Sequence, residues 1–545
     1  MIIKKASSIP IIVSDPYFSI WSDTDKLYEG DLVHWAKMRQ KIRGYINVDG
    51  EIFCFMGNRQ FHNVIEQKYV DVTATATEYF FENEKVTLKV RFTSPLIGDD
   101  LTLVSRPCTY VDFEVTKKKA DVVKINMILG DELVSGERGQ MIIGDSFVQS
   151  SKNGNPAFNY AYMGRAFQKP LGNSGDNISI DWGYAYVAAT DMNVSLSFDQ
   201  PDKQLMVDIN MENTNESDII IAYDDIISIN YFGQWRKAYW TNIYGDILTA
   251  IGASFYDKAD VIRRAKAVDE DIYNKAYNIG KEKYAFLCNM SYRHAFAAHK
   301  LITDDEGNVI FLSKENDSNG CIGTVDVSYP SVPLFLLYNT EYVKGMLRPV
   351  FKFAQMDVWD YDFAPHDVGR YPYAWGQVYG LNPKKWEKAF SGAHGAIFPN
   401  FYMYPQGSEI YDLRYQMPVE ECGNMLILTS VVCKMDGSAE FAKPYLSLLD
   451  QWAKYLLEYG EDPGEQLCTD DFAGHLSHNV NLSAKAILGI EAYARLLEQS
   501  GDEIQAAYYH DKAVNMAKSW EERAKQDDHY ALAFGSDNTW SLKYN

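Results

Sequence analysis

The sequence predicts a multidomain β + α protein with an N-terminal antiparallel β-sandwich, a helical linker and a domain of the α/α-toroid type. We place these parts at residues 1–230, 231–281 and 282–545. Three observations lead to this prediction. The chain of 545 residues is too long for one hydrophobic core, apolar residues alternate in its first part, and a helical period replaces that alternation after about Asp225.

The first part is predicted to consist of antiparallel strands. Residues 86–92 alternate apolar and polar side chains, as on a strand with one buried face. Residues 42–48 have the same alternation and run into Asp49-Gly50, a strong hairpin signal. Residues 194–198 alternate with serines. Because turn residues recur at short intervals and no long helical pattern interrupts them, we expect a sandwich.

The middle of the chain combines helices with a long aperiodic segment. Helical periodicity covers residues 245–280, about 282–301 and about 331–356, and a short strand is expected at 309–312. Residues 357–416 are rich in aromatic residues, glycine and proline and show no period. A segment of this length without regular structure is usually a functional loop assembly.

Helices dominate the last part of the chain. They are predicted near residues 418–437, 439–459, 480–500 and 502–526. Pro418 suits the first turn of a helix, and Gly437 and Gly501 suit helix ends. Successive helices joined by alternately short and long loops favour an α/α toroid.

Composition and charge narrow the class of partner. The apolar fraction of 46% is that of a folded globular protein, which excludes wholesale disorder. The net charge of −22 repels phosphate backbones and anionic lipid, so we expect neither nucleic acid nor a membrane as a partner. The N-terminus has no apolar stretch of signal length, which favours a cytoplasmic protein, or a secreted one if a leader was removed.

The cysteines favour reduced thiols. They are seven in number, widely spaced and without a C-x-x-C motif, which argues against both a disulfide framework and a zinc site. Cys422 and Cys468 adjoin acidic clusters, but buried thiols are more frequent than nucleophilic ones. We therefore expect a small-molecule substrate, no cofactor and no metal. The oligomeric state is not indicated.

The segment Gln466–His475 is the most informative motif. It packs two adjacent carboxylates, Asp470 and Asp471, with glycine, alanine and a histidine, and no apolar period runs through it. We expect a shaped loop ahead of a helix that begins near Asn479. Carboxylates just before a helix are well placed to act as catalytic groups, but they are also ordinary helix-capping residues. Both interpretations stay open.

Three other clusters carry acids in or beside loops. Asp326 comes just before a predicted helix, which it could simply cap. His366-Asp367 pairs an imidazole with a carboxylate that can orient it for proton transfer. Glu420 and Glu421 fall in a predicted first helical turn, where the helix dipole alone would stabilise them by about 0.3–1 kcal/mol. If the helix starts share one mouth of a toroid, these acids converge with the Asp470-Asp471 pair on one cleft and can share acid and base roles on a water.

Seven segments together resemble one known family, the glutaminase A family of fungi and many bacteria. These segments are Ile9–Trp21, Ala222–Asp225, Gly323–Ser331, Phe363–Asp367, Met417–Asn424, Gln466–His475 and Trp540–Asn545. The resemblance implies an N-terminal β-sandwich, an (α/α)6 toroid of the six-hairpin glycosidase type, and hydrolysis of L-glutamine to glutamate and ammonia. It carries no agreed set of catalytic residues. Relatives continue beyond the last segment, so we expect the toroid to be truncated at the C-terminus of this chain.

We therefore expect a hydrolase of L-glutamine or a related γ-amide in which a carboxylate activates water. Asp471 or Glu421 is the expected base, and a second carboxylate or His366 the expected acid. The candidate catalytic residues are Glu420, Glu421, Asp470, Asp471, His366 and Asp367; the candidate substrate-binding residues are Asp326, Asn424, His475, Trp359, Asp362 and Arg293. Arg293 or Lys300 would hold the substrate's α-carboxylate, unless both are surface charges.

Two other functions remain open. The first is a glycoside hydrolase of the six-hairpin type, with Trp359, Tyr361 and Trp375 stacking on sugar. The second is a binding protein without catalysis, in which the acidic clusters would not converge.

Overall fold

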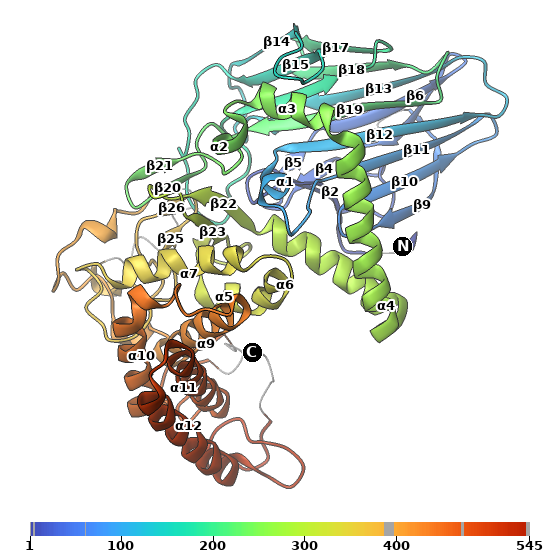
Figure 1. Ribbon diagram of the computed structural model, residues 1–545. Coiled ribbons are helices and arrows are strands. Elements are labelled where there is room, and N and C mark those ends of the chain that lie inside the picture. Colours follow the sequence, from blue (N-terminus) through green and yellow to red (C-terminus); the bar gives the residue numbers. More distant parts are fainter. Residues whose placement is uncertain (1, 4–5, 60–61, 386–396, 470–473, 541–545) are drawn as a thin grey trace. The chain divides into compact units, whose positions relative to one another are not determined.

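The chain divides into two compact units (Figure 1). The computed structural model describes residues 2–3, 6–59, 62–385, 397–469 and 474–540. The first unit comprises Met1–Gly172, Asn177–Ser228 and Lys237–Lys300; the second comprises Asn173–Asp176, Ile229–Arg236 and Leu301–Asn545. The predicted domain limits at residues 230 and 281 stay predictions.

The first unit is rich in β-structure. Its nine-stranded sheet has the order β1 (Ile2–Ile3), β9 (Glu66–Val72), β10 (Ala76–Glu82), β11 (Val86–Thr93), β12 (Cys108–Lys117), β19 (Glu216–Asp224), β16 (Tyr184–Ala189), β15 (Phe158–Arg165) and β14 (Ile142–Gln149), and all its neighbouring strands are antiparallel. Its six-stranded sheet has the order β17 (Val194–Asp199), β18 (Gln204–Asn210), β13 (Val123–Gly130), β6 (Ile42–Val48), β7 (Glu51–Met56) and β8 (Asn63–Val64). A four-stranded sheet holds β2 (Ile9–Val13), β3 (Ser19–Ser22), β4 (Leu32–His34) and β5 (Arg39–Gln40).

The strands expected from period-2 alternation are confirmed. On β11 the apolar positions are buried and the polar positions between them are half-buried. β6 and β7 form the expected hairpin, in which Val48 pairs with Glu51. Gly50 in the turn has φ +92°, a backbone conformation that residues other than glycine adopt only at an energetic cost. The serine-alternating segment is β17.

The helices of the first unit are α1 (Leu101–Ser105), α2 (Thr241–Tyr244), α3 (Ile247–Tyr256) and α4 (Lys258–Ala297). α4 kinks where Gly280 and Lys281 leave helical geometry, so the two helices predicted on either side of residue 281 run on through a bend. The predicted continuation of the second helix to residue 301 is wrong. The chain leaves the helix after Ala297 and forms strand β22 (His299–Thr303).

A buried ion triad lies in the first unit. Lys300 Nζ lies 2.5 Å from Asp15 Oδ2 and 2.7 Å from Asp225 Oδ2. Ser228 donates a further hydrogen bond to Asp225 Oδ2 at 2.7 Å. Lys300 and Asp225 are buried, whereas Asp15 is half-buried. Although burial lowers the pKa of Lys300, the two carboxylates outweigh it and raise the pKa above its usual value. Lys300 therefore stays charged inside the protein.

Helices dominate the second unit. They are α5 (Val325–Ser328), α6 (Val332–Leu336), α7 (Thr340–Ala354), α9 (Pro418–Asp436), α10 (Leu446–Tyr459), α11 (Val480–Ser500) and α12 (Glu503–Ala524). Its short strands are β20 (Ile229–Tyr231), β21 (Gln234–Arg236), β23 (Val309–Ser313), β24 (Cys321–Ile322), β25 (Gly369–Arg370) and β26 (Tyr373–Ala374). The chain thus has a β-rich N-terminal region and a helical C-terminal region.

Apart from the end of α4, the helix ends follow local signals with one exception. Gly437 and Gly501 end α9 and α11 in the left-handed conformation, as predicted. The helix predicted from residue 439 begins only at Leu446, because the residues before it form a 3-10 turn around Pro444, which has no backbone N–H for a helix interior.

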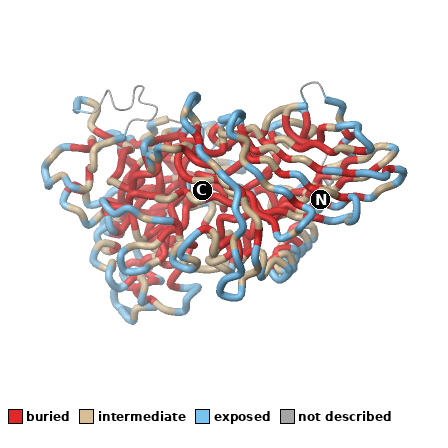
Figure 2. Tube along the Cα trace, turned by 90° about the horizontal axis from the view of Figure 1, so that it is seen from above, coloured by how far each residue is buried: buried red, intermediate tan, exposed pale blue. Residues whose placement is uncertain are grey.

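α9 packs among α7, α10 and α11, and α11 also packs along α12 (Figure 1). Because neighbours surround it, α9 is buried at almost every position from Pro418 to Cys433. Buried positions also fill most strands, although β14 is largely exposed, and exposed positions are frequent in the loops (Figure 2). Within the part of the chain that the structure describes, no helix is both long and apolar enough to cross a bilayer.

Candidate functional site

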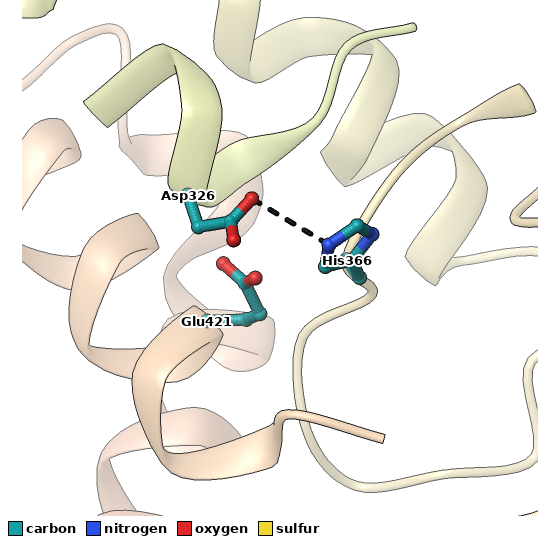
Figure 3. A group of neighbouring side chains, drawn as sticks. All are labelled: Asp326, His366 and Glu421. Atoms are coloured by element: carbon teal, nitrogen blue, oxygen red, sulfur yellow. Dashed lines mark ion pairs between the residues drawn. The ribbon is translucent and has the colours of Figure 1, made fainter. Parts of the chain in front are cut away.

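Three buried side chains converge in the second unit (Figure 3). Asp326 comes from α5, His366 from the segment after α7, and Glu421 from the first turn of α9. One nitrogen or oxygen atom of each lies within 4.8 Å of the others, and His366 Nε2 lies 3.5 Å from Asp326 Oδ1. The three residues are 6%, 5% and 0% exposed. The sequence predicted this convergence on an open cleft, whereas the structure shows a buried cluster.

Asp367 holds the ring of His366. Its Oδ2 lies 3.0 Å from His366 Nδ1, and its two oxygens accept hydrogen bonds from the backbone N–H groups of Gly369, Val378 and Tyr379. The ring of Tyr379 stacks on the imidazole at 4.2 Å. Because an ionised carboxylate only accepts, Nδ1 carries a proton and Nε2 is directed at Asp326. Burial lowers the pKa of His366, but the charges of Asp326 and Asp367 outweigh it and raise the pKa to about 10.

Glu420 and Glu421 have different partners. Thr469 donates its hydroxyl to Glu420 Oε1 at 2.5 Å and its backbone N–H to Oε2 at 2.7 Å. Asn424 donates to Glu421 Oε2 at 3.2 Å, while Glu421 Oε1 has no hydrogen-bond partner within the described chain. Burial raises the pKa of both carboxyls, and the charge of Asp326 adds to the rise. The helix dipole does not account for them, because burying an ionised carboxylate costs several kcal/mol and the dipole returns about 1 kcal/mol.

Lys485 on α11 supplies a cation beside these acids. Its Nζ donates to Asn424 Oδ1 at 2.7 Å and lies 3.6 Å from the centre of the Tyr329 ring. Burial lowers the pKa of Lys485 to about 8, against the opposing effect of Glu420 and Glu421. Asn424 thus links the lysine of α11 to the carboxylate of α9.

Two glycines let α9 and α11 approach closely at this place. A Cβ on Gly489 would lie 3.0 Å from Gly423 Cα and 2.9 Å from Leu456 Cδ1. A Cβ on Gly423 would lie 2.6 Å from Lys485 Cγ. The close approach therefore positions the glutamates, Asn424 and Lys485 together.

Gly489→Val is expected to destabilise the second unit by about 1–3 kcal/mol, because overpacking forces the two helices apart. Denaturant unfolding measures the change. The control is Gly464→Val, at an exposed position where no atom lies within 4 Å of an added Cβ. Equal stability of the two variants would contradict the role of the close approach.

The structure corrects one capping interpretation and replaces another. Asp326 does not cap α5: Thr324 occupies the cap position, and Asp326 Oδ2 lies 3.1 Å from the hydroxyl oxygen of Thr469. Asn479 caps α11, where its side chain accepts from two backbone N–H groups. Asp470 and Asp471 lie outside the described residues.

The other predicted binding residues have different surroundings. Trp359 is buried among Phe353 and Tyr411, and its indole N–H donates to Phe363 O at 2.8 Å. Asp362 and His475 are exposed.

Arg293 belongs to the first unit, where it is fully buried. Its Nη1 donates to Thr73 O at 3.5 Å, and burial lowers its pKa to about 10. The alternative that Arg293 is a surface charge is wrong.

Sequence reasoning missed three residues near the cluster. Glu315 is buried and accepts from the Thr324 hydroxyl at 2.7 Å, and Thr469 and Lys485 make the contacts given above. The available signal was Lys485 itself, because it lies on the same helical face as the apolar residues Leu482 and Ala486.

Comparisons with known proteins agree on one family. Residues 281–545 match the family described as the glutaminase A six helical-hairpin domain, and residues 3–65 and 75–219 match two domains of unknown function. Glutaminase A of Aspergillus oryzae is 24% identical over 597 residues, which cover 99% of this chain and 80% of that protein. A probable glutaminase of Arthroderma benhamiae is 22% identical over 658 residues, with coverage of 99% and 72%.

Solved structures show weaker likeness. A bacterial glucoamylase complexed with acarbose matches with a TM-score of 0.46 at 10% identity. The match covers 97% of this chain and 70% of the glucoamylase chain. A GH92 α-mannosidase from Bacteroides thetaiotaomicron has a TM-score of 0.37 at 10% identity, with coverage of 98% and 64%. The family match and the two glutaminase relatives decide the assignment, and the chain is an enzyme whose residues 281–545 belong to the glutaminase A family.

Proposed function

We propose that this chain hydrolyses L-glutamine, or a related small γ-amide, to the acid and ammonia, and that Asp326, His366 and Glu421 carry the reaction. The convergence of these side chains from three separate segments is the observation that supports it. The names of the two fungal relatives supply the substrate class. We also propose that the β-rich region is a sandwich and that the helical region is part of an (α/α)6 toroid.

In this proposal the two carboxylates act on water and the imidazole on the leaving group. Asp326 and Glu421 hold the attacking water, and Glu421, which has an oxygen without a hydrogen-bond partner in the described part of the chain, takes its proton. The water oxygen bonds to the γ-carbonyl carbon, the C–N bond breaks, and His366 Nε2 delivers the proton with which ammonia leaves. Asp367 keeps the ring in place.

Lys485 replaces Arg293 as our candidate for attracting the substrate's α-carboxylate. It is a buried cation next to the acidic cluster, held by Asn424 and Tyr329. Arg293 is buried in the first unit, where its Nη1 donates to Thr73 O.

Ammonia release from L-glutamine tests the proposal. We expect release by the wild type and a loss of about 10²- to 10⁴-fold in Asp326→Asn, the range over which acid–base groups contribute. Asp471→Asn tests the residue that the sequence favoured, and Asp357→Asn, an exposed acid outside the cluster, serves as the control. No release by the wild type, or full activity in Asp326→Asn, would refute the proposal. Turnover of aryl glycosides in its place would favour the glycosidase.

A further inference from the structure

We propose that Asp326, His366 and Glu421 bind a divalent transition-metal ion. Each offers one ligand atom, and these atoms lie within 4.8 Å of one another. Ligands about 2.1 Å from a tetrahedral ion lie about 3.4 Å apart. The distance of 3.5 Å between His366 Nε2 and Asp326 Oδ1 matches that separation. This departs from the metal-free site expected from the absence of zinc motifs in the sequence.

Two unsatisfied oxygens point to a ligand at this place. Glu421 Oε1 and Asp326 Oδ1 are buried and make no hydrogen bond to any residue that the structure describes. Leaving a buried polar atom unpaired costs about 1–3 kcal/mol, and more when it is charged. Figure 3 shows both carboxylates turned toward each other and toward the imidazole. One cation between the three groups would satisfy both oxygens.

The surroundings of His366 are those of a metal ligand. A ligating histidine commonly donates its other ring N–H to a carboxylate, which fixes the ring and raises its basicity. Asp367 does this at Nδ1, and three backbone N–H groups fix Asp367 in turn. Nε2 is left facing Asp326.

The charge balance also favours a cation. Asp326, Asp367, Glu420 and Glu421 are all buried, and His366 and Lys485 are the basic groups beside them. Lys485 is directed at Asn424, one residue removed from the carboxylates. Buried acids need compensating positive charge, and a divalent ion would supply it where the unsatisfied oxygens lie.

The donor atoms decide the class of ion. One imidazole nitrogen and two carboxylate oxygens suit Zn²⁺ or Mn²⁺, whereas Ca²⁺ sites use oxygen ligands throughout. Three protein ligands leave a position for water or substrate, as in catalytic zinc sites. The ion would share its residues with the proposed hydrolysis. While His366 Nε2 ligates the ion, that atom cannot deliver the proton to ammonia, so the proposed reaction scheme applies to the metal-free chain. Binding is measurable without any turnover.

Metal titration of the full chain tests the inference. The protein is treated with EDTA, dialysed and titrated separately with ZnCl2 and MnCl2 by calorimetry, and the untreated protein is analysed for metal content. We expect one ion per chain, with a Kd of about 1 μM or tighter for at least one of the two metals. Binding weaker than about 1 mM for both metals overturns the proposal.

Glu421→Gln and Glu420→Gln form a matched pair, because both residues are buried in the same helical turn and only Glu421 offers an unpaired oxygen. We expect at least a 100-fold loss of affinity in Glu421→Gln and less than a tenfold loss in Glu420→Gln. Equal losses overturn the proposal.

Thermal melting of the wild type needs no variant. A specific ion must raise Tm after EDTA treatment, since it binds the folded state, and an unchanged Tm at saturating metal overturns the proposal. EDTA-treated protein that hydrolyses glutamine fully without binding metal refutes the ion alone. Metal binding without glutamine hydrolysis refutes the proposed substrate alone.

Discussion

Asp367→Asn is expected to lower kcat/KM on glutamine by about 10³- to 10⁴-fold, the size of effect that an aspartate-to-asparagine change has in an Asp–His catalytic pair. An asparagine must put its NH2 where an oxygen now accepts. In the position of Oδ1, the NH2 group would face the backbone N–H groups of Gly369 and Val378. In the position of Oδ2, it would face the backbone N–H group of Tyr379 and the ring nitrogen Nδ1 of His366. The second orientation meets fewer donors. The change also removes a charge that raises the pKa of His366, and a ring that becomes neutral beside this NH2 carries its proton on Nε2.

Nitrogen-15 NMR of the histidines separates this positioning role from a loss of folding. We expect the His366 signals to change from a doubly protonated ring in the wild type to a neutral ring protonated at Nε2 in Asp367→Asn, while the other histidines keep their signals. Asp357→Asn, an exposed acid in the same segment, is expected to retain both the protonation of His366 and the activity. Unchanged protonation of His366 in a folded, inactive Asp367→Asn would show that Asp367 acts in another way.

Lys300→Met is expected to lower the free energy of unfolding of the first unit by about 3–5 kcal/mol. Methionine keeps much of the volume but removes the charge, so the buried carboxyl group of Asp225 loses its cation beside Asp15. Hydrogen exchange of the β19 amides in denaturant measures the local loss. The double variant Lys300→Met, Asp225→Asn should recover part of it, because one of the stranded charges is gone.

Lys258→Met is the control for that experiment. Lys258 bridges Asp112 and Asp218 in the same unit, but these carboxylates are about one third exposed. Water can solvate both acids once the lysine is removed, so we expect a loss below about 1 kcal/mol. Equal losses in the two lysine variants would show that burial does not decide the cost.

The strands and most helices were predictable because their signals are local. Alternation on β11, Asp49-Gly50 before β7, and glycine after α9 and α11 act within a few residues. The start of α10 and the end of α4 were not predictable in this way. A 3-10 turn precedes α10, and after Ala297 the chain pairs as a strand instead of continuing the helix α4. Tertiary context decides such places.

Most acids of the candidate site and His366 were predictable from the sequence, whereas Glu315 and Lys485 were not. The pair His366-Asp367 and the glutamates of α9 stand out because acids rarely sit in apolar surroundings. Lys485 comes from a helix more than fifty residues further along the chain, and nothing near it in sequence shows its partner Asn424. An acid at a helix start can cap the helix or point into the protein interior. Sequence spacing does not distinguish these two cases, and for Asp326 only the structure shows that the side chain is buried.

The glycine contact between α9 and α11 has a consequence for folding kinetics. Until these helices dock at Gly423 and Gly489, Lys485 cannot reach Asn424, and the glutamates of α9 stay in water. Closing the long loop between segments costs chain entropy before any contact repays it. Mutual repulsion of the acids opposes collapse over the same interval. We therefore expect the cluster to be completed late in folding, with these charges hydrated in partly folded chains, which limits the aggregation of such chains.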